Sequence, residues 1–262
     1  MKTKNLLLTG IFLMLISCSE KENLTSNPGE IDLEVAIENA ENRRKSDPNS
    51  SGGNKCLLEF QSKYDELIAE NDVLTATGFS KDLMETKYQK VMKNPEYHEF
   101  LFKFNNKRMG KVKGFDREMQ LPDVVAVKGI KAMSLTDFEN TYRAITDEEM
   151  DLANQTMDDM LEGKSGDNQA EAAMNEIEKQ DISKEQVKEV SGKLMDTFKE
   201  VSEGYRKVRD LGDAARWNLV TNELMVLQNG VKFEIRTDLS NDPKVNQKVA
   251  FELAQIILNK CK

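Results

Sequence analysis

The residues of this chain that could do chemistry are few, because it contains one histidine and three cysteines. His98 would have to serve any Ser-His-Asp or Cys-His arrangement, since there is no second imidazole to act as a general base. The sequence has no glycine-rich phosphate loop, nucleophile elbow or zinc-ligand spacing. A lone histidine is more often an ordinary surface or core residue. The sequence therefore predicts neither catalysis nor a cofactor.

The first 17 residues have the layout of a signal peptide. Lys2 and Lys4 precede an apolar run from Leu6 to Ile16, and the small residue Ser17 stands before Cys18. Eleven residues at a rise of about 1.5 Å span only about 16 Å, roughly half of a ~30 Å hydrocarbon core. We therefore expect a processed leader and no retained transmembrane anchor.

The segment Leu15-Ile16-Ser17-Cys18 resembles the lipobox of bacterial lipoproteins. The resemblance implies cleavage before Cys18, a thioether-linked diacylglycerol on its sulfur and an acyl chain on its new amino terminus. One acyl chain holds a protein to a membrane only marginally, so three chains would hold it almost permanently. The alternative is an ordinary secretory leader with a chance cysteine at the cut.

The residues after Cys18 indicate to which membrane of the cell envelope the protein is sent. In lipoproteins of Gram-negative bacteria a serine such as Ser19 generally permits transfer to the outer membrane, and some groups use a charged tract to reach the cell surface. Glu20-Lys21-Glu22 is similar to such a tract, but could equally be part of a solvated tether. We expect an outer-membrane lipid anchor, with the body on the periplasmic face or at the cell surface.

Composition limits the class of partner. The 262 residues carry a formal charge of −9, and loss of Lys2 and Lys4 with the leader leaves −11. Such an acidic protein is a poor candidate for nucleic-acid binding, which requires basic surface. Charged residues make up 32% and aromatic residues 6%, which suits a helix-rich domain that stands off the membrane.

Residues 18–55 are predicted to be a flexible tether. The segments Asn27-Pro28-Gly29 and Ser46–Asn54 are turn-forming and contain little apolar surface to bury. Between them an alternating apolar set could form a short strand or a turn of helix: Ile31, Leu33, Val35 and Ile37. If disordered, the tether reaches roughly 30 to 35 Å. The folded domain is expected over 56–262.

The two remaining cysteines, Cys56 and Cys261, allow a single intramolecular pairing. An exported chain meets oxidising conditions, and closing a loop of about 200 residues could stabilise the fold by on the order of 5 kcal/mol. The alternative is two separately buried thiols, because free cysteine packs as a small apolar group. We predict the disulfide.

Methionines and acids offer possible metal ligands in the second half of the chain. Met157 and Met160, with Met150 and Met174 nearby, could present thioethers to copper, but methionine at helical spacing is more often core filler. The acids around them lack the alternating oxygen ligands and glycine of a calcium loop: Asp147, Glu148, Glu149, Asp151, Asp158 and Asp159. We expect a solvated helix face and no metal.

One segment is basic against this acidic background. It contains six cations and a single acid, Asp116: Lys103, Lys107, Arg108, Lys111, Lys113 and Arg117. Loops that join extended pieces commonly carry binding function, so the segment could bind lipid A phosphates, acidic glycans or an acidic envelope protein. Lysines on strand edges also prevent aggregation, which is the alternative.

Periodicity in the first half predicts helices and then strands. Cys56, Phe60, Tyr64, Leu67 and Ile68 recur at helical spacing. A second helix is expected from a cap at Ser80 to about Lys93, with Leu83, Tyr88 and Val91 inward and Pro95 marking its end. Alternating Phe100, Phe102 and Phe104 predict a half-buried strand, and further extended pieces are expected at Lys111 to Phe115 and Val124 to Val127.

The second half has clearer signals. Capping boxes at Thr146–Glu149 and Ser183–Gln186 start two helices, the latter reaching about Val208. Asn229-Gly230 predicts a two-residue hairpin turn that pairs Val226 with Phe233, Leu224 with Ile235 and Glu223 with Arg236. Asp242-Pro243 starts a last, largely buried helix, in which Ala250, Ala254, Ile257 and Cys261 share one stripe.

Together these elements predict an α+β fold: a helix-rich domain with short antiparallel strands, a C-terminal hairpin and a final helix. Over roughly 50 residues, the C-terminal part of the sequence is similar to the last unit of certain bacterial envelope lipoprotein domains. The similar residues are Leu211-Gly212-Asp213-Ala214-Ala215, the hairpin, and Ala250–Leu258 with the closing cysteine. We expect a non-enzymatic binding or scaffolding lipoprotein. The alternatives are an enzyme acting on envelope polymers and a lipoprotein that sequesters a toxin or inhibitor.

Overall fold

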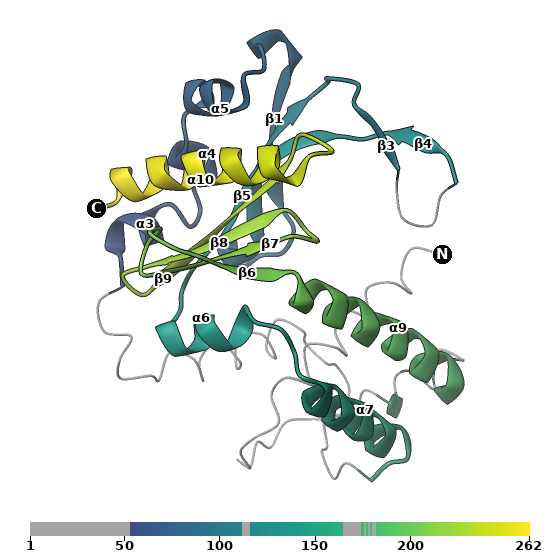
Figure 1. Ribbon diagram of the computed structural model, residues 1–262. Helices are drawn as coiled ribbons and strands as arrows, with labels where there is room; N and C mark the ends of the chain where they lie inside the picture. Colours follow the sequence, from purple (N-terminus) through teal and green to yellow (C-terminus); the bar gives the residue numbers. More distant parts are fainter. Residues whose placement is uncertain (1–52, 112–115, 165–173, 176, 178, 180–181) are drawn as a thin grey trace. The chain divides into compact units, whose positions relative to one another are not determined.

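The computed structural model of the protein describes residues 53–111, 116–164, 174–175, 177, 179 and 182–262 (Figure 1). The predicted leader with Cys18, most of the tether and Lys113 lie outside these residues. Where the sequence predicts one domain over 56–262, the contacts of the described residues form two compact units, one within residues 145–200 and the other made of residues 53–144 with 201–262. We call residues 145–200 the helical unit, and residues 53–144 with 201–262 the sheet unit.

The sheet unit is built on a seven-stranded sheet in which every neighbouring pair is antiparallel. The order is β1-β2-β5-β9-β8-β7-β6. The strands are β1 (Met84–Lys90), β2 (His98–Phe104), β5 (Asp123–Ala132), β6 (Tyr205–Val208), β7 (Ala214–Asn218), β8 (Glu223–Gln228) and β9 (Val231–Asp238). The central pair β5–β9 joins the first part of the chain to the last, with Val127 opposite Ile235.

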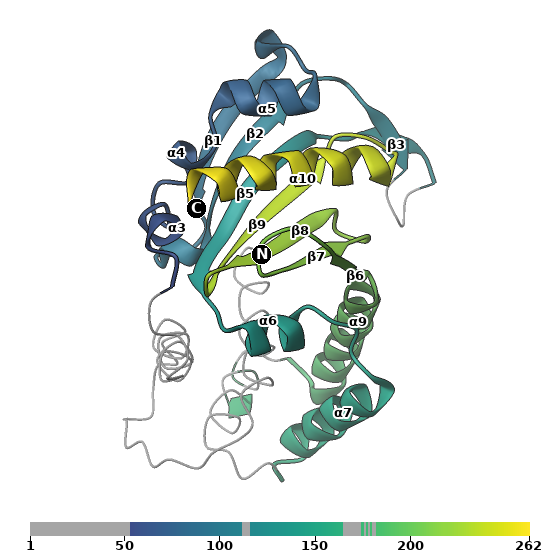
Figure 2. The same ribbon diagram turned by 60° about the vertical axis from the view of Figure 1, so that its left-hand side comes forward.

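One face of this sheet carries the main core. Helix α10 (Pro243–Lys260) lies across it and contacts β9, β8 and α5 (Glu70–Thr77) (Figure 2). Alternate residues of the strands point to this face, because successive side chains of a strand point to opposite sides. Phe102, Val127, Phe233, Leu253 and Ile257 are all fully buried there. The predicted α+β class is confirmed.

Shorter elements complete the sheet unit. They are the helices α3 (Lys55–Glu59), α4 (Tyr64–Leu67) and α6 (Leu135–Thr141), the 3-10 turns η3 (Lys81–Leu83) and η4 (Pro95–Tyr97), and a two-stranded arm of β3 (Met109–Lys111) and β4 (Glu118–Gln120). A bulge interrupts β5 at Gly129, whose φ of 70° favours glycine. A Cβ there would lie 2.9 Å from Cδ of Glu234, so the bulge also leaves room for that side chain.

The hairpin and the last helix form as predicted. Val226 lies opposite Phe233, Leu224 opposite Ile235 and Glu223 opposite Arg236. Asn229 and Gly230 have φ of 48° and 72°, the left-handed values that a tight primed turn requires. Asp242 caps α10 by accepting a hydrogen bond from the Lys244 N–H, and Pro243 occupies the first turn.

Two expectations for the first half are wrong. The predicted helix from Ser80 to Lys93 is instead η3 followed by β1, and Val91 is 65% exposed. Met84, Thr86 and Tyr88 pair with Phe104, Phe102 and Phe100, so pairing with an aromatic strand outweighs the helical spacing. The predicted first helix is broken into α3 and α4, and Tyr64 at the start of α4 accepts a hydrogen bond from Ile130 N and donates one to Pro95 O.

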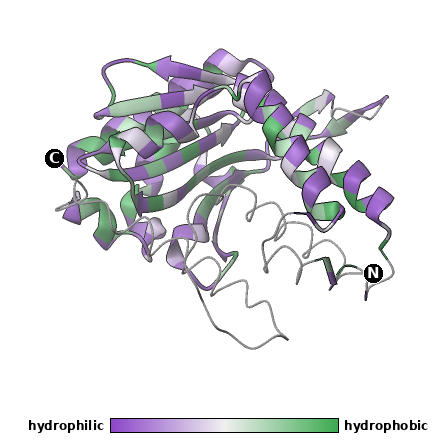
Figure 3. Ribbon diagram, turned by 90° about the horizontal axis from the view of Figure 1, so that it is seen from below, coloured by the Kyte–Doolittle hydropathy of each residue, from purple (hydrophilic) through white to green (hydrophobic). Residues whose placement is uncertain are grey.

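The helical unit contains α7 (Asp147–Leu161) and most of α9 (Lys184–Glu203), and the alternation of polar and apolar residues along both can be followed in Figure 3. Both predicted capping boxes are present. Helix α9 ends at Glu203 instead of reaching Val208, because Tyr205–Val208 pairs with β7 as β6. Lys188 pairs with Asp158 at 2.7 Å, and Lys199 pairs with Asp147, which joins the two helices.

Candidate functional site

His98 lies at the start of β2 and is 6% exposed. Its Nε2 is 2.9 Å from the carbonyl of Met92, and its Nδ1 is 3.4 Å from the hydroxyl of Tyr88. A carbonyl can only accept, so Nε2 carries a hydrogen and donates it to Met92; in the neutral ring Nδ1 then accepts from Tyr88. Both nitrogens are therefore used to hold the turn between β1 and β2.

The methionines and acids of the helical unit have structural partners. Met157, Met160 and Met174 form the core of this unit with Leu161, Ile177 and Val187, and Met150 is also buried. Asp147 and Asp158 pair with lysines of α9. Within the described residues, no group of three or more histidine, cysteine, aspartate or glutamate side chains is arranged to hold a metal ion.

The basic segment is divided among different places. Lys103 lies within β2, whereas Lys107, Lys111 and Arg117 are exposed on or beside the β3–β4 arm. Lys111 faces Glu118 across the arm, which offsets part of its charge. Binding of an anionic ligand by these four residues stays a prediction.

Arg108 is different from the rest of the basic segment, because its side chain is 10% exposed and each of its three guanidinium nitrogens donates a hydrogen bond. Nε donates to Asp123 Oδ1 at 2.5 Å, Nη2 to Asp238 Oδ1 at 2.7 Å and Nη1 to Asn241 Oδ1 at 2.8 Å. Nη2 also reaches the carbonyls of Pro122 and Asp238 at 3.1 and 3.2 Å. The side chain of Asp123 is fully buried. Arg108 is thus a structural link between the arm, β5, β9 and the β9–α10 loop, and its role in ligand binding stays a prediction.

The second face of the sheet carries a cluster of charges that the sequence did not reveal. We call Lys128, Glu223, Lys232, Glu234 and Tyr142 the charged cluster. Lys128 Nζ lies 2.6 Å from Glu223 Oε1 and 3.8 Å from Glu234 Oε2, and Lys232 Nζ pairs with Glu234 Oε1. Tyr142, which caps the C-terminus of α6, donates its hydroxyl hydrogen to Glu234 Oε1 at 3.2 Å. Every charge in the cluster has an opposite partner.

Two groups of the charged cluster, and the neighbouring Tyr205, have pKa values far from neutral pH. Burial alone would raise the pKa of Glu234, but Lys232, Lys128 and the Tyr142 hydroxyl outweigh it and lower this pKa to about 2. Burial and the nearby Glu234 raise the pKa of Tyr142 well above its usual value, and that of Tyr205 to about 12. At pH 7 Glu234 is a carboxylate and both phenols are protonated. General acid–base catalysis works best with a group that titrates near the working pH, so these groups suit a structural role.

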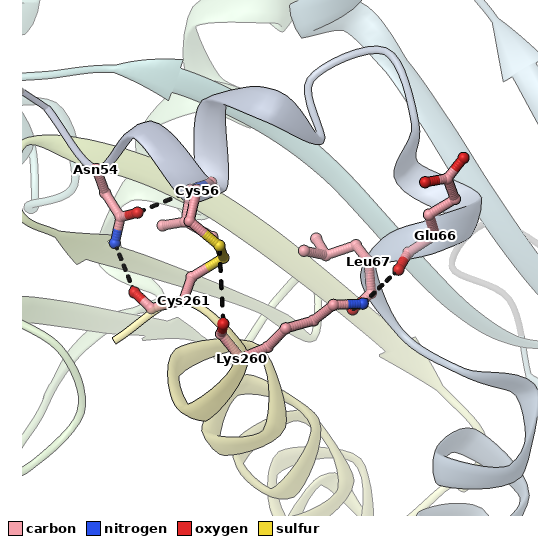
Figure 4. The surroundings of a disulfide bond; sticks show 7 residues. Asn54, Cys56, Glu66, Leu67, Lys260 and Cys261 are labelled. Carbon is pink, nitrogen blue, oxygen red and sulfur yellow. Dashed lines mark hydrogen bonds between the residues drawn. A yellow bond between two sulfur atoms is a disulfide. The ribbon is translucent and has the colours of Figure 1, made fainter.

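Cys56 and Cys261 lie at bonding distance, with 1.96 Å between their sulfurs and 5.4 Å between their Cα atoms. Cys261 ends α10 and is 2% exposed. The carbonyl of Lys260 is 3.7 Å from Cys56 Sγ, but a disulfide sulfur carries no hydrogen to donate to it. The bond joins the start of the sheet unit to the end of the chain (Figure 4).

The charge of the protein is concentrated in the helical unit. Residues 145–200 contain 16 acidic and 6 basic residues, a formal charge of −10 in a chain of −9. Several of these acids are exposed on α7 and α9, among them Glu148, Asp151 and Asp196. Charge concentrated in one unit produces a strong local field, which attracts partners of opposite charge and repels those of like charge.

Comparison with family models, with curated proteins and with solved structures finds no match to this chain. Among the described residues, no helix combines the length and the apolar character needed to cross a bilayer.

Proposed function

We propose that the protein is a membrane-anchored envelope lipoprotein whose folded body is a non-enzymatic binding module. The observation that carries the anchor is the leader that ends in Ser17-Cys18, with its cationic start and short apolar run. The pairing of Cys56 with Cys261 supports the same conclusion, because disulfides persist mainly in exported proteins.

Binding is supported by the chemistry of the groups that an enzyme would use. Both nitrogens of His98 hold a turn, and Glu234 has a pKa of about 2 within a cluster of matched charges. An enzyme acting on envelope polymers would need a group that exchanges protons near neutral pH. These residues are poorly placed for that work.

The acidic helical unit supports a basic protein as the partner. A unit with a formal charge of −10 is repelled by anionic lipid headgroups and attracted by basic protein surfaces. Sequestration of a basic toxin or inhibitor is a second candidate function that the same observation favours. In either case the anchor keeps the binding surface at the membrane.

Substitution Cys18→Ser is expected to abolish membrane anchoring, because it removes the sulfur that would carry the diacylglycerol. The variant should take up no radiolabelled palmitate and should leave the membrane fraction after an alkaline wash. The double variant Cys56→Ser/Cys261→Ser is the matched control, since it also removes cysteines and should remain labelled. A Cys18→Ser protein that still sediments with alkaline-washed membranes would refute the anchor.

Neutralising exposed acids of the helical unit is expected to weaken partner binding several-fold, and raising the salt should have the same effect. The test variant is Glu148→Gln/Asp151→Asn/Asp196→Asn. The matched control removes three exposed acids from the sheet unit, as Glu59→Gln/Glu85→Gln/Glu118→Gln. Crosslinking in envelope fractions measures the recovery of the wild-type partner. Equal recovery by both triple variants would exclude the helical unit as the binding surface.

A further inference from the structure

Four large apolar side chains are exposed at one end of the sheet unit, which we call the apolar end: Met109, Leu219, Val220 and Val245. Met109 is 49% exposed, and the other three are 44–47% exposed. They belong to the β3–β4 arm, to the turn between β7 and β8 and to the first turn of α10. In Figure 1 and Figure 2 these three parts lie at the same end of the sheet.

Hydrogen bonds join the three parts of the apolar end. Asn241, in the loop before α10, donates Nδ2 to the carbonyl of Met109 at 2.9 Å. Thr237 of β9 donates its N–H to the carbonyl of Asn222, which follows the apolar pair of the β7–β8 turn, at 3.0 Å. The hydroxyl of Thr237 donates to the carbonyl of Asn246 in α10 at 2.9 Å. The arm, the turn and the start of α10 are therefore connected to one another through β9 and the loop that follows it.

The β7–β8 turn keeps its shape through a buried amide. Asn218 is 1% exposed, and its Oδ1 accepts from the N–H groups of Val220 and Thr221 at 2.8 and 3.1 Å. Its Nδ2 donates to the carbonyl of Val201 at 2.8 Å. Exposed turn positions usually carry glycine, proline, asparagine, aspartate or serine. Leu219 and Val220 instead present two adjacent apolar side chains on a fixed backbone, which favours a contact with an apolar partner.

Charged side chains surround these apolar residues. The exposed cations are Lys107, Lys111, Arg117 and Lys244, and the exposed acids among them are Asp116, Glu118 and Asp242. Four cations against three acids give +1, compared with −10 for the helical unit. Apolar side chains with lysines beside them suit the interface of a bilayer. The apolar groups enter the boundary between headgroups and acyl chains, while the ammonium groups stay among the phosphates.

We propose that the apolar end docks on the surface of the bilayer that holds the lipid anchor. The proposal rests on the anchor at Cys18, which places this bilayer within reach of the folded body. The described chain begins at Gly53, and the N–H of Asn54 donates to the carbonyl of Asn229 at the opposite end of the sheet. Residues 19–52 span up to about 120 Å when extended, whereas the eight residues of β9 span about 26 Å. The tether is therefore long enough for the apolar end to face the bilayer, and the two contacts together fix the orientation of the sheet unit.

Flotation with lipid vesicles tests the contact without the anchor. The protein is the mature chain from residue 18 with Cys18→Ser, so that no lipid is attached. The vesicles contain phosphatidylethanolamine with about 30% phosphatidylglycerol. Salt at about 0.5 M screens the repulsion between the acidic helical unit and the anionic headgroups. The unlipidated chain is expected to float with the vesicles, and Leu219→Ser/Val220→Ser should weaken vesicle binding about tenfold, because two apolar side chains no longer enter the bilayer.

The matched control removes two exposed apolar side chains from other parts of the sheet unit, as Val91→Ser/Leu135→Ser. This control should float like the unlipidated chain. Denaturant unfolding followed through the buried Trp217 establishes that both double variants are folded. Absence of flotation by the unlipidated chain would overturn the proposal, and so would equal flotation by folded Leu219→Ser/Val220→Ser.

Light scattering of the same proteins examines a second copy of the chain as the occupant. A dimer that Leu219→Ser/Val220→Ser alone makes monomeric, without flotation of the unlipidated chain, would assign the apolar end to that second copy and overturn docking on the bilayer. None of these outcomes depends on palmitate labelling at Cys18. Failure of the docking contact is therefore distinct from failure of the anchor.

Discussion

Substitution Arg108→Met is expected to destabilise the sheet unit by about 3–5 kcal/mol, since it leaves a fully buried carboxylate without its cation. Asp123 has no exposed side-chain surface, and its Oδ2 already lacks a hydrogen-bond partner among the described residues. Asp238 and Asn241 lose their guanidinium contacts as well. Denaturant unfolding followed through Trp217, the only tryptophan, measures the loss in this unit.

Arg117→Met is the matched control for this substitution, because Arg117 is exposed and the effect of its loss should lie within about 0.5 kcal/mol. The double variant Arg108→Met/Asp123→Asn should recover part of the stability, since it also removes the buried charge. If Arg108→Met unfolded at the same denaturant concentration as wild type, Arg108 would not be the structural link described above.

Substitution Glu234→Gln is expected to destabilise the sheet unit by about 3 kcal/mol at pH 7, because Lys232, whose side chain is 5% exposed, loses its carboxylate partner. Lys128 still pairs with Glu223 at 2.6 Å in this variant, so the loss of stability comes mainly from the unpaired Lys232. Glu85→Gln removes an exposed carboxylate from the edge strand β1 and should cost little. Trp217 fluorescence again reports the unfolding of this unit.

The same carboxylate makes stability depend on pH. The pKa of Glu234 is about 2 in the folded protein against 4.5 for an ordinary glutamate, so its contribution is present above about pH 4.5 and is lost as the pH falls toward 2. Wild type should therefore approach the stability of Glu234→Gln over this range. A gap between the two proteins that stays constant from pH 5 to pH 2 would contradict the lowered pKa.

Local signals predicted the last third of the fold well. The Asn229-Gly230 turn fixes the register of β8 and β9, because the turn and the alternation of apolar residues specify the same pairing. Asp242-Pro243 marks the start of α10 for an equally local reason. Both features depend on neighbouring residues only.

The errors arise where distant residues decide the structure. Leu83, Tyr88 and Val91 have helical spacing, yet β1 forms because Tyr88 and Thr86 pair with the phenylalanines of β2. Gly129 at the bulge and Tyr64 at the start of α4 likewise meet residues far along the chain, namely Glu234 and Ile130. No short window of sequence contains that information.

The candidate sites were predictable to different degrees. Pairing of Cys56 with Cys261 was predicted by counting cysteines in a chain expected to be exported. The engagement of Arg108 instead depends on distant residues, Asp238 at the end of β9 and Asn241 in the loop that follows it. The charged cluster was missed because Lys128, Lys232 and Glu234 occupy alternate positions that usually face solvent on a sheet. In the structure they lie together on adjacent strands, with Lys128 directly opposite Glu234.

The β5–β9 pairing in the middle of the sheet has a consequence for the order of folding. Strands β1, β2 and β5 form one half of the sheet, and β5 can pair with the other half only after β9 has been synthesised. The helix α10, which covers the core face, is synthesised later still. Contacts between such distant segments form slowly, because a long loop must close first. We therefore expect the seven-stranded sheet to be completed only after the last third of the chain has been synthesised.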